Sequence, residues 1–91
     1  MNEWYVYILR CADDTFYTGI ARDVEKRLLE HNHDDRLASK YTRARRPLML
    51  IYKEPCASRS AASKREVEIK KLPRSQKALL LNSPANLLTR H

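Results

Sequence analysis

The sequence predicts an α+β fold in which helices pack on a small three-stranded sheet, antiparallel or mixed, in the element order ββαβαα. Two segments rich in aromatic and β-branched residues, 3–10 and 15–20, are separated by a turn signal. A third apolar run of strand length follows at 48–52, and segments with helix start signals lie between and after the strands. With 91 residues, the chain is expected to be one domain, 1–91, without room for a second.

The first two strands are predicted to form a hairpin, because the Ala-Asp-Asp sequence at 12–14 is a turn signal between them. A three-residue loop places Tyr7 opposite Gly19. Alternate residues of a strand point to the same side of a sheet, so Tyr7, Leu9, Tyr17 and Gly19 share one face. A register shifted by one residue would separate the two tyrosines.

A helix is predicted from Asp23, a plausible N-cap, to about residue 32. Val24 and Leu28 lie four residues apart and form its inner stripe. At about 100° per residue, Arg27 and His31 fall together on one edge of that stripe. Both side chains are therefore expected to point along the surface of the sheet.

Prolines mark the limits of the remaining elements. In chain order, we expect an irregular polar segment (34–46), a strand covered on both faces (48–52, ending before Pro55), a helix from Ser58 or Ser60 to Leu72, and a short helix after Pro73 through Leu81.

Charge is distributed unevenly along the chain. Residues 1–35 carry four basic and eight acidic side chains, a net charge of −4, whereas residues 36–77 carry thirteen basic and three acidic ones, a net charge of +10. The formal charge of the whole chain is +7, and its pI is near 9.7. An anionic partner, nucleic acid first and a membrane surface second, is expected to contact mainly the later part of the chain.

Composition excludes several classes of protein. A hydrophobic content of 43% argues against a disordered basic tail. No apolar stretch approaches the ~18 residues of a membrane span, and residues 1–4 do not resemble a signal peptide, so we expect a soluble cytoplasmic protein. Cys11 and Cys56 lack CxxC spacing and are expected to be small buried hydrophobes. Together with His31 and His33 they lack the paired spacing of a zinc finger.

The segment 40–46 is a candidate nucleic-acid strip, because four of its seven residues are cations and Tyr41 lies among them. Arginine forks suit phosphate oxygens, and an aromatic ring can stack on an exposed base. The alternative is a solvated surface loop. The residues predicted to contact nucleic acid are Lys40, Arg43, Arg45 and Arg46 of this segment, with Lys64, Arg65 and Lys70 of the following helix.

Glu66 and Glu68 are the only acidic residues of the second predicted helix. A carboxylate among cations can hold a hard divalent cation that keeps most of its waters and uses substrate phosphate as a further ligand. Alternatively, both acids form surface ion pairs, Glu66 with Lys70 and Glu68 with Lys64 or Lys71. Helical periodicity does not choose between these two interpretations.

Several motifs occur together: Val6-Tyr7-Ile8, then Tyr17-Thr18-Gly19 ten residues on, then Arg27 and His31 one helical turn apart, and finally Glu66. This set resembles the GIY-YIG nuclease superfamily, in particular its short stand-alone bacterial branch. The resemblance extends from about residue 4 to 80, with 82–91 as a C-terminal tail. It implies a three-stranded antiparallel sheet with flanking helices. Val6 stands where the first motif begins with glycine, a change that an ordinary strand position should tolerate.

The resemblance implies catalytic roles for several of these side chains. Tyr7 and Tyr17 are expected to lie by the scissile phosphate, where one of them helps to activate water. Arg27 would steady the phosphate, and His31 would lie near the nucleophile. Gly19 closes the second motif, where the absence of a side chain lets Tyr7 or the substrate approach.

The resemblance also implies that Glu66 binds one Mg²⁺ or Mn²⁺ ion, which with an arginine would stabilise charge on the phosphate. Tyrosine has a reference pKa of about 10 and needs nearby cations to act as a base, whereas a histidine such as His31 has a reference pKa of about 6.5 and accepts a proton more easily. Both remain candidates for the base. Some enzymes of the family use a late asparagine, for which Asn82 and Asn86 are the available positions.

Together, these residues predict a metal-dependent endonuclease that hydrolyses phosphodiester bonds of DNA. Because one small domain leaves no second domain to read sequence, cleavage is expected to be structure-directed or weakly sequence-specific, or to depend on a partner protein. The alternative is a non-catalytic nucleic-acid-binding module on the same fold. Only the nuclease requires Glu66 to lie near the tyrosines.

Overall fold

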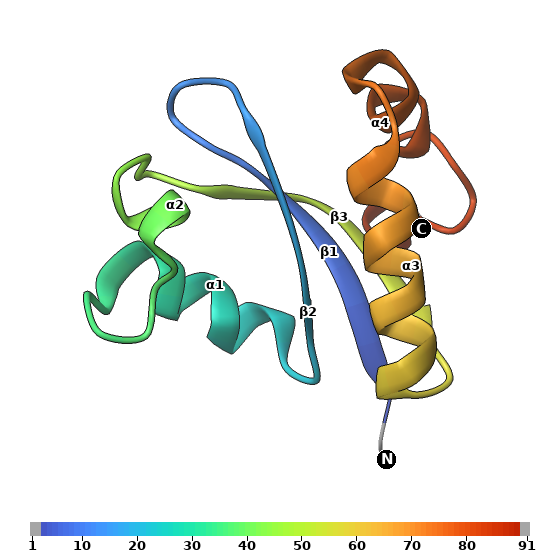
Figure 1. Cartoon of the computed structure of the whole chain (residues 1–91), viewed down its shortest axis with the longest axis horizontal. Helices are drawn as coiled ribbons and strands as arrows, with labels where there is room; N and C mark the ends of the chain where they lie inside the picture. Colours follow the sequence, from blue (N-terminus) through green and yellow to red (C-terminus); the bar gives the residue numbers. More distant parts are fainter. Residues whose placement is uncertain (1–2, 90–91) are drawn as a thin grey trace.

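The structure is a computed structural model that describes residues 3–89, and it contains a three-stranded antiparallel sheet between two groups of helices (Figure 1). The strand order is β2-β1-β3, so the first strand is central. The predicted α+β class and element order are confirmed. The elements are β1 (Trp4–Arg10), β2 (Phe16–Ala21), α1 (Val24–His33), α2 (Lys40–Arg43), β3 (Met49–Cys56), α3 (Arg59–Lys71), α4 (Arg74–Leu80) and the 3-10 helix η1 (Leu87–Thr89).

The hairpin of β1 and β2 has the predicted register. Tyr7 is paired with Gly19 and Leu9 with Tyr17 across the two strands. The turn closes with a hydrogen bond of 2.8 Å from the backbone N–H of Cys11 to the carbonyl of Thr15. This register places both motif tyrosines on the same side of the sheet.

The two faces of the sheet are covered by different helices, α1 and α2 on one side and α3 and α4 on the other (Figure 1). The alternating side chains of β1 therefore contribute to two cores. The core on the α1 side consists of Tyr7, Leu9, Cys11, Val24 and Leu48, and that on the α3 side consists of Val6, Ile8, Tyr52 and Ile69.

Strand β3 differs from its prediction in length and in burial. It continues through Pro55 to Cys56, where it pairs with the start of β1. Because β3 is an edge strand, one side of its backbone has no ladder to maintain, and a proline is tolerated there. Edge position also explains why Met49 at its start is 55% exposed, although the apolar run suggested cover on both faces.

Side-chain caps begin two of the helices, α1 at the predicted residue and α3 at the first of the two predicted serines. The Asp23 carboxylate accepts a hydrogen bond of 3.0 Å from the N–H of Lys26 at the start of α1. Ser58 accepts one of 3.1 Å from the N–H of Ala61 at the start of α3, which ends before Pro73. The expectation that 34–46 is irregular is wrong at α2, a single helical turn whose local capping is described below.

The segment expected as a tail packs against the sheet as far as the structure describes it. Asn86 is buried, and its side-chain oxygen accepts hydrogen bonds from the N–H groups of Lys53 and Leu88 at 3.1 and 3.2 Å. Its amide nitrogen donates to the carbonyls of Ile51 and Leu81 at 3.1 and 3.0 Å. Residues 90–91 of the expected tail lie outside the described residues.

The cysteines were expected to be small buried hydrophobes, which holds for Cys11 and only in part for Cys56. Cys11 is buried and Cys56 half-buried, and both are free thiols. Within residues 3–89, no helix is both long and apolar enough to cross a membrane.

Candidate active site

The candidate site lies where Tyr7 of the central strand β1 is paired with Gly19 of the edge strand β2. A Cβ placed on Gly19 would lie 2.6 Å from the Tyr7 hydroxyl oxygen and 2.7 Å from the ring carbon that bears it. The glycine does not have a positive φ angle, so its role is to leave space and not to permit an unusual backbone. The missing side chain allows the end of the Tyr7 ring to lie against Gly19 and to reach His31 of α1.

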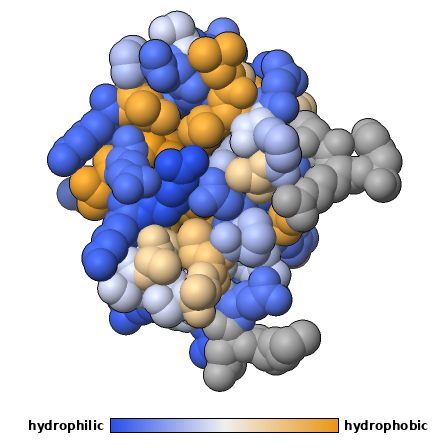
Figure 2. All heavy atoms as spheres, turned by 90° about the vertical axis from the view of Figure 1, so that its right-hand side faces the viewer, coloured by the Kyte–Doolittle hydropathy of each residue, from blue (hydrophilic) through white to orange (hydrophobic). Residues whose placement is uncertain are grey.

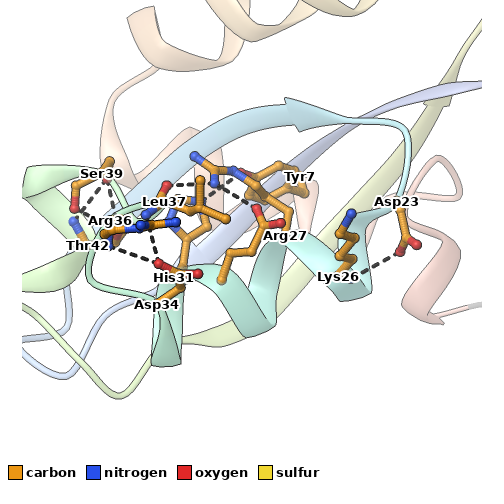
Figure 3. Close-up of polar contacts among 11 residues, drawn as sticks. Tyr7, Asp23, Lys26, Arg27, His31, Asp34, Arg36, Leu37, Ser39 and Thr42 are labelled. Carbon is orange, nitrogen blue, oxygen red and sulfur yellow. Dashed lines mark hydrogen bonds and ion pairs between the residues drawn. The ribbon is translucent and has the colours of Figure 1, made fainter.

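His31 of α1 lies against the end of the Tyr7 ring (Figure 3). The Tyr7 hydroxyl and His31 Nε2 are 3.0 Å apart, and the other ring nitrogen, Nδ1, is 2.8 Å from the Thr42 hydroxyl. Tyr7, His31 and Thr42 are all buried, with exposed fractions of 1%, 0% and 0%. Both ring nitrogens of His31 are thus held by side chains from other elements.

Burial controls the protonation of this pair. It lowers the pKa of His31 to about 4, and the positive charges of Arg27 and Arg46 act in the same direction while Glu30 opposes them. Burial also raises the pKa of the Tyr7 hydroxyl well above its ordinary value; Tyr17 raises it further, and Arg27 partly opposes this. At neutral pH the imidazole is therefore neutral and the phenol keeps its proton.

Arg27 lies one helical turn before His31, on the same edge of α1. Its guanidinium donates to the Glu30 carboxylate at 2.9 Å and to the Leu37 carbonyl at 2.8 Å, and its side chain remains 29% exposed. Burial alone would lower the Arg27 pKa, but contacts with Glu30 and Tyr7 outweigh it and raise the pKa. Arg27 is a fixed cation at the rim of the site, partly accessible to an anion.

Tyr17 continues the site outward from His31. Its ring meets the imidazole edge-on, with centroids 5.2 Å apart, and stacks on the Tyr41 ring of α2 at 6.0 Å. The Arg45 guanidinium lies over the Tyr41 ring at 3.8 Å. The site is therefore flanked by a stack of flat groups that reaches the surface.

Glu66 lies on α3, in the helical layer on the face of the sheet opposite α1 (Figure 1). Its negative charge raises the Tyr7 pKa and is the smallest of the influences on that group. Glu66 also forms an ion pair of 3.0 Å with Lys70, one of the two arrangements that the sequence left open. Its side chain is 22% exposed, so solvent and a ligand can reach it.

The carboxylate of Glu66 is a donor of the kind that Mg²⁺ and Mn²⁺ bind. Among the described residues, no three His, Cys, Asp or Glu side chains cluster closely enough to form a multidentate metal centre. A single accessible carboxylate fits a hydrated ion that takes its remaining ligands from water and phosphate. It does not fit an ion enclosed by protein ligands.

Comparison with known proteins decides the family. The model of the GIY-YIG catalytic domain matches residues 3–78, most of the chain. The chain belongs to the GIY-YIG family. Nucleases of this family act on nucleic acid. The fold and the motif spacing seen above agree with this membership.

Two relatives are similar to this GIY-YIG chain over most of its length. The UPF0213 protein DP2720 of Desulfotalea psychrophila is 49% identical over 80 residues, covering 88% of this chain and 72% of that one. The UPF0213 protein SSP2268 of Staphylococcus saprophyticus is 44% identical over 82 residues, covering 90% and 98%. These names assign no activity.

Two solved structures have the same GIY-YIG architecture. The solution NMR structure of protein EF2693 from E. faecalis has a TM-score of 0.64 at 38% identity and covers 100% of this chain and 93% of that chain. The solution NMR structure of the UPF0213 protein BH0048 from Bacillus halodurans has a TM-score of 0.57 at 35% identity and covers 94% and 89%.

Within the GIY-YIG motif, the departure at Val6 is explained by the fold. Val6 is fully buried, and it belongs to the core on the α3 side, on the opposite face of β1 from Tyr7. A side chain at this position fills that core and does not point toward the candidate site. The fold therefore does not require a glycine at position 6, whereas a Cβ at position 19 would clash with the Tyr7 ring.

The basic residues predicted to contact nucleic acid fall into two groups. Lys40, Arg43, Lys64 and Lys70 are exposed. On the face formed by α3 and α4, Figure 2 shows hydrophilic side chains beside several hydrophobic ones. The others are more strongly engaged within the fold. Arg45 pairs with Asp13 at 3.0 Å, Arg46 pairs with Asp35 at 2.7 Å and donates to the His31 carbonyl at 2.8 Å, and Arg65 pairs with Glu54 at 3.1 Å and with Glu68 at 3.2 Å.

Three residues near the site were not found from the sequence as site residues. Thr42 contacts His31, Ser39 contacts Thr42, and Tyr41 was noted only as an aromatic within the basic segment. A Ser-x-x-Thr spacing at the start of the predicted basic segment was the available signal, because it can cap one helical turn. The late asparagine Asn86, by contrast, lies at β3, the edge of the sheet opposite β2.

Proposed function

We propose that this protein is a divalent-metal-dependent endonuclease that hydrolyses phosphodiester bonds of DNA at the β2 edge of its sheet. One observation carries the proposal: a buried tyrosine hydroxyl contacts a neutral histidine at 3.0 Å, beside a partly exposed arginine. A buried acid–base pair beside a fixed cation suits a reaction that adds negative charge to a phosphate.

The proton path follows from the two ionisation states. Tyr7 can take a proton from water only as its own proton leaves, because its raised pKa keeps the phenol protonated. His31 Nε2 is the acceptor within reach. A phosphate bound beside Arg27 would offset the positive charge that disfavours an imidazolium, so substrate binding itself makes His31 a better base.

The remaining residues hold the substrate. Arg27 offers a guanidinium fork for two phosphate oxygens. Tyr17 lies 6.5 Å from Tyr7 between ring centroids and bounds the position of the phosphate. Glu66 would hold one Mg²⁺ or Mn²⁺ ion, which would supply positive charge to stabilise the negative charge added to the phosphate during hydrolysis.

The size of the domain supports weak sequence specificity. We further propose that this domain recognises DNA by its structure or through its backbone charge, and that a cytoplasmic protein partner supplies any further specificity. A nucleic-acid-binding module without catalysis is the second candidate. It is favoured by the exposed cations Lys40, Arg43 and Lys64, which require no reaction.

Cleavage assays on branched, nicked, linear and single-stranded DNA, with Mg²⁺ or Mn²⁺, test the proposal. We expect wild-type cleavage, and losses of at least about 100-fold for Arg27→Ala and Glu66→Ala. Unchanged cleavage in both variants would show that the site is elsewhere. Salt-sensitive binding without cleavage under either metal would favour the binding module.

A further inference from the structure

We propose that Thr42 is a positioning residue that holds neutral His31 in the tautomer protonated at Nδ1, leaving Nε2 to accept the Tyr7 proton. The effect of this tautomer on cleavage rests on the proposed function. The assignment of the hydrogen bonds is independent of that function. It follows from how many protons and lone pairs Thr42, Ser39 and His31 have to share.

The hydroxyl of Thr42 has one proton, and that proton has a partner. Thr42 Oγ1 donates to the backbone carbonyl of Ser39 at 3.2 Å, an oxygen that can only accept. The Ser39 hydroxyl lies 2.9 Å from Thr42 Oγ1 and accepts the Thr42 N–H at 3.2 Å, so its own proton is free to point to Oγ1. Towards His31, Thr42 therefore acts as an acceptor.

The tautomer of His31 follows from this donor count. At 2.8 Å from an accepting hydroxyl, Nδ1 must carry the proton. A neutral imidazole has one N–H, so Nε2 presents a lone pair. The Tyr7 hydroxyl, 3.0 Å away, then donates to it. The opposite tautomer would require Thr42 to turn its proton to Nδ1 and to leave the Ser39 carbonyl without that bond.

The position of Thr42 in the fold makes it a suitable anchor. Ser39 is the N-cap of α2, so the contacts that start this helical turn also fix the Thr42 hydroxyl (Figure 3). Thr42 is fully buried, which excludes water as a competing partner for Nδ1. The surrounding charges on His31 come from Arg27 and Glu30 of α1 and from Arg46 after α2.

Nitrogen NMR of the histidine ring measures this tautomer directly in the full chain at pH 7. In wild type we expect the ¹⁵N chemical shift of His31 Nδ1 to be that of a protonated ring nitrogen and the chemical shift of Nε2 to be that of an unprotonated one. Thr42→Val keeps the shape but removes the acceptor, so the Nδ1–H population should fall; Thr42→Ser should restore it. His33, exposed on the same helix, is the internal control.

The outcomes separate the two proposals. Protonation of wild-type His31 at Nε2 would overturn the role of Thr42, and so would an Nδ1–H population that stays unchanged in Thr42→Val. The wild-type spectrum decides the first point even where the variant fails to fold. The assigned tautomer in a protein that cleaves no DNA would leave the Thr42 assignment standing and remove the nuclease. If both hold, Thr42→Val should lower kcat by roughly 10- to 100-fold with little change in KM, and Thr42→Ser should recover it.

Discussion

The Tyr7 ring occupies the space that a side chain at position 19 would fill, with its hydroxyl oxygen 2.6 Å from where a Cβ on Gly19 would stand. Gly19 is the only glycine among 91 residues. Because its backbone is ordinary, the constraint is steric and acts on one neighbour. The hydrogen bond between Tyr7 and His31 depends on this contact.

Gly19→Ala should therefore displace the Tyr7 ring and break its contact with His31. Contacts below 3 Å cannot be relieved without movement, and overpacking of this kind costs about 1–3 kcal/mol of unfolding free energy. Urea denaturation measures that loss. DNA cleavage by the folded variant should fall as far as in Tyr7→Phe, because both changes remove the same hydrogen bond.

A double-mutant cycle serves as the control for this steric explanation. In a Tyr7→Ala background the clashing ring is absent, so adding Gly19→Ala should cost little or no further stability. A cost as large as in wild type would show that position 19 needs glycine for another reason.

Stability should depend on pH through His31. Its pKa in the folded state is about 4, below the ordinary value of about 6.5 that applies to the unfolded chain. Above about pH 6.5 neither state is protonated there, but between 6.5 and 4 the unfolded state takes up the proton first. The unfolding free energy should fall by about 3 kcal/mol over this window as the pH is lowered.

Thermal or urea unfolding at several pH values in wild type and His31→Gln checks this dependence. In the variant, the unfolding free energy should no longer fall between pH 6.5 and 4. It should still fall below pH 4, where Asp13 and Asp34 become protonated, because the fold holds the pKa of both carboxyl groups below its ordinary value. Equal slopes in both proteins would show that His31 is not the group responsible.

Local signals explain how much of the fold was predictable. The turn at 12–14 and the strand patterns specify the register of Tyr7 with Gly19, and Asp23 and Ser58 begin their helices as expected. The sequence pattern could not predict that β3 lies at the edge of the sheet, because a central strand and an edge strand can have the same apolar run. Its passage through Pro55 follows from that position.

The candidate site was predictable only where its residues share an element or a hairpin. Tyr7, Tyr17, Arg27 and His31 lie within one hairpin and the helix after it, and the structure brings them together. Thr42 reaches the site by a hydrogen bond across eleven residues of polar chain, which no periodicity describes.

Glu66 and Glu68 provide a matched pair for testing the metal. Both lie on α3 and both form ion pairs, with Lys70 and Arg65, so Gln substitutions remove the same charge from one helix. Glu66→Gln should abolish most Mg²⁺-dependent cleavage, whereas Glu68→Gln should leave it nearly unchanged. Each should alter stability by no more than about 1 kcal/mol, since partly exposed ion pairs contribute little.

Titration of cleavage against Mg²⁺ concentration measures this difference. Chelation by EDTA should stop the wild-type reaction, and added Mg²⁺ should restore it. Equal effects of the two substitutions would remove Glu66 as the metal ligand.

The exposed cations of α2 should control affinity and not turnover. Lys40 and Arg43 are exposed on α2, and Arg43 donates a hydrogen bond to the Asp35 carbonyl. The double substitution Lys40→Ala with Arg43→Ala should therefore weaken DNA binding. It should also make the slope of log K against log salt concentration shallower by about two. Binding by fluorescence anisotropy at several salt concentrations tests this. Lys71→Ala with Lys77→Ala, on the other side of the sheet, is the matched control, and an equal loss there would indicate non-specific attraction.

Asn86 should matter for stability and not for cleavage. Its buried amide joins the C-terminal segment to β3, and Asn86→Ala would leave the N–H of Lys53 and the carbonyls of Ile51 and Leu81 without that partner. Each such buried group costs about 1–3 kcal/mol, so we expect a total loss of about 3 kcal/mol or more. Asn82→Ala, at an exposed position, should change stability by less than about 0.5 kcal/mol.

Cleavage measured at a temperature where Asn86→Ala is still folded separates the two roles. Because Asn86 lies at β3, on the far edge of the sheet from Gly19, its loss should leave kcat and KM near their wild-type values. Near-UV circular dichroism confirms the folded state under the assay conditions. A folded Asn86→Ala protein that binds DNA but no longer cleaves it would place the asparagine in the reaction, as in those family enzymes that use a late asparagine, and would require the site to extend around the sheet.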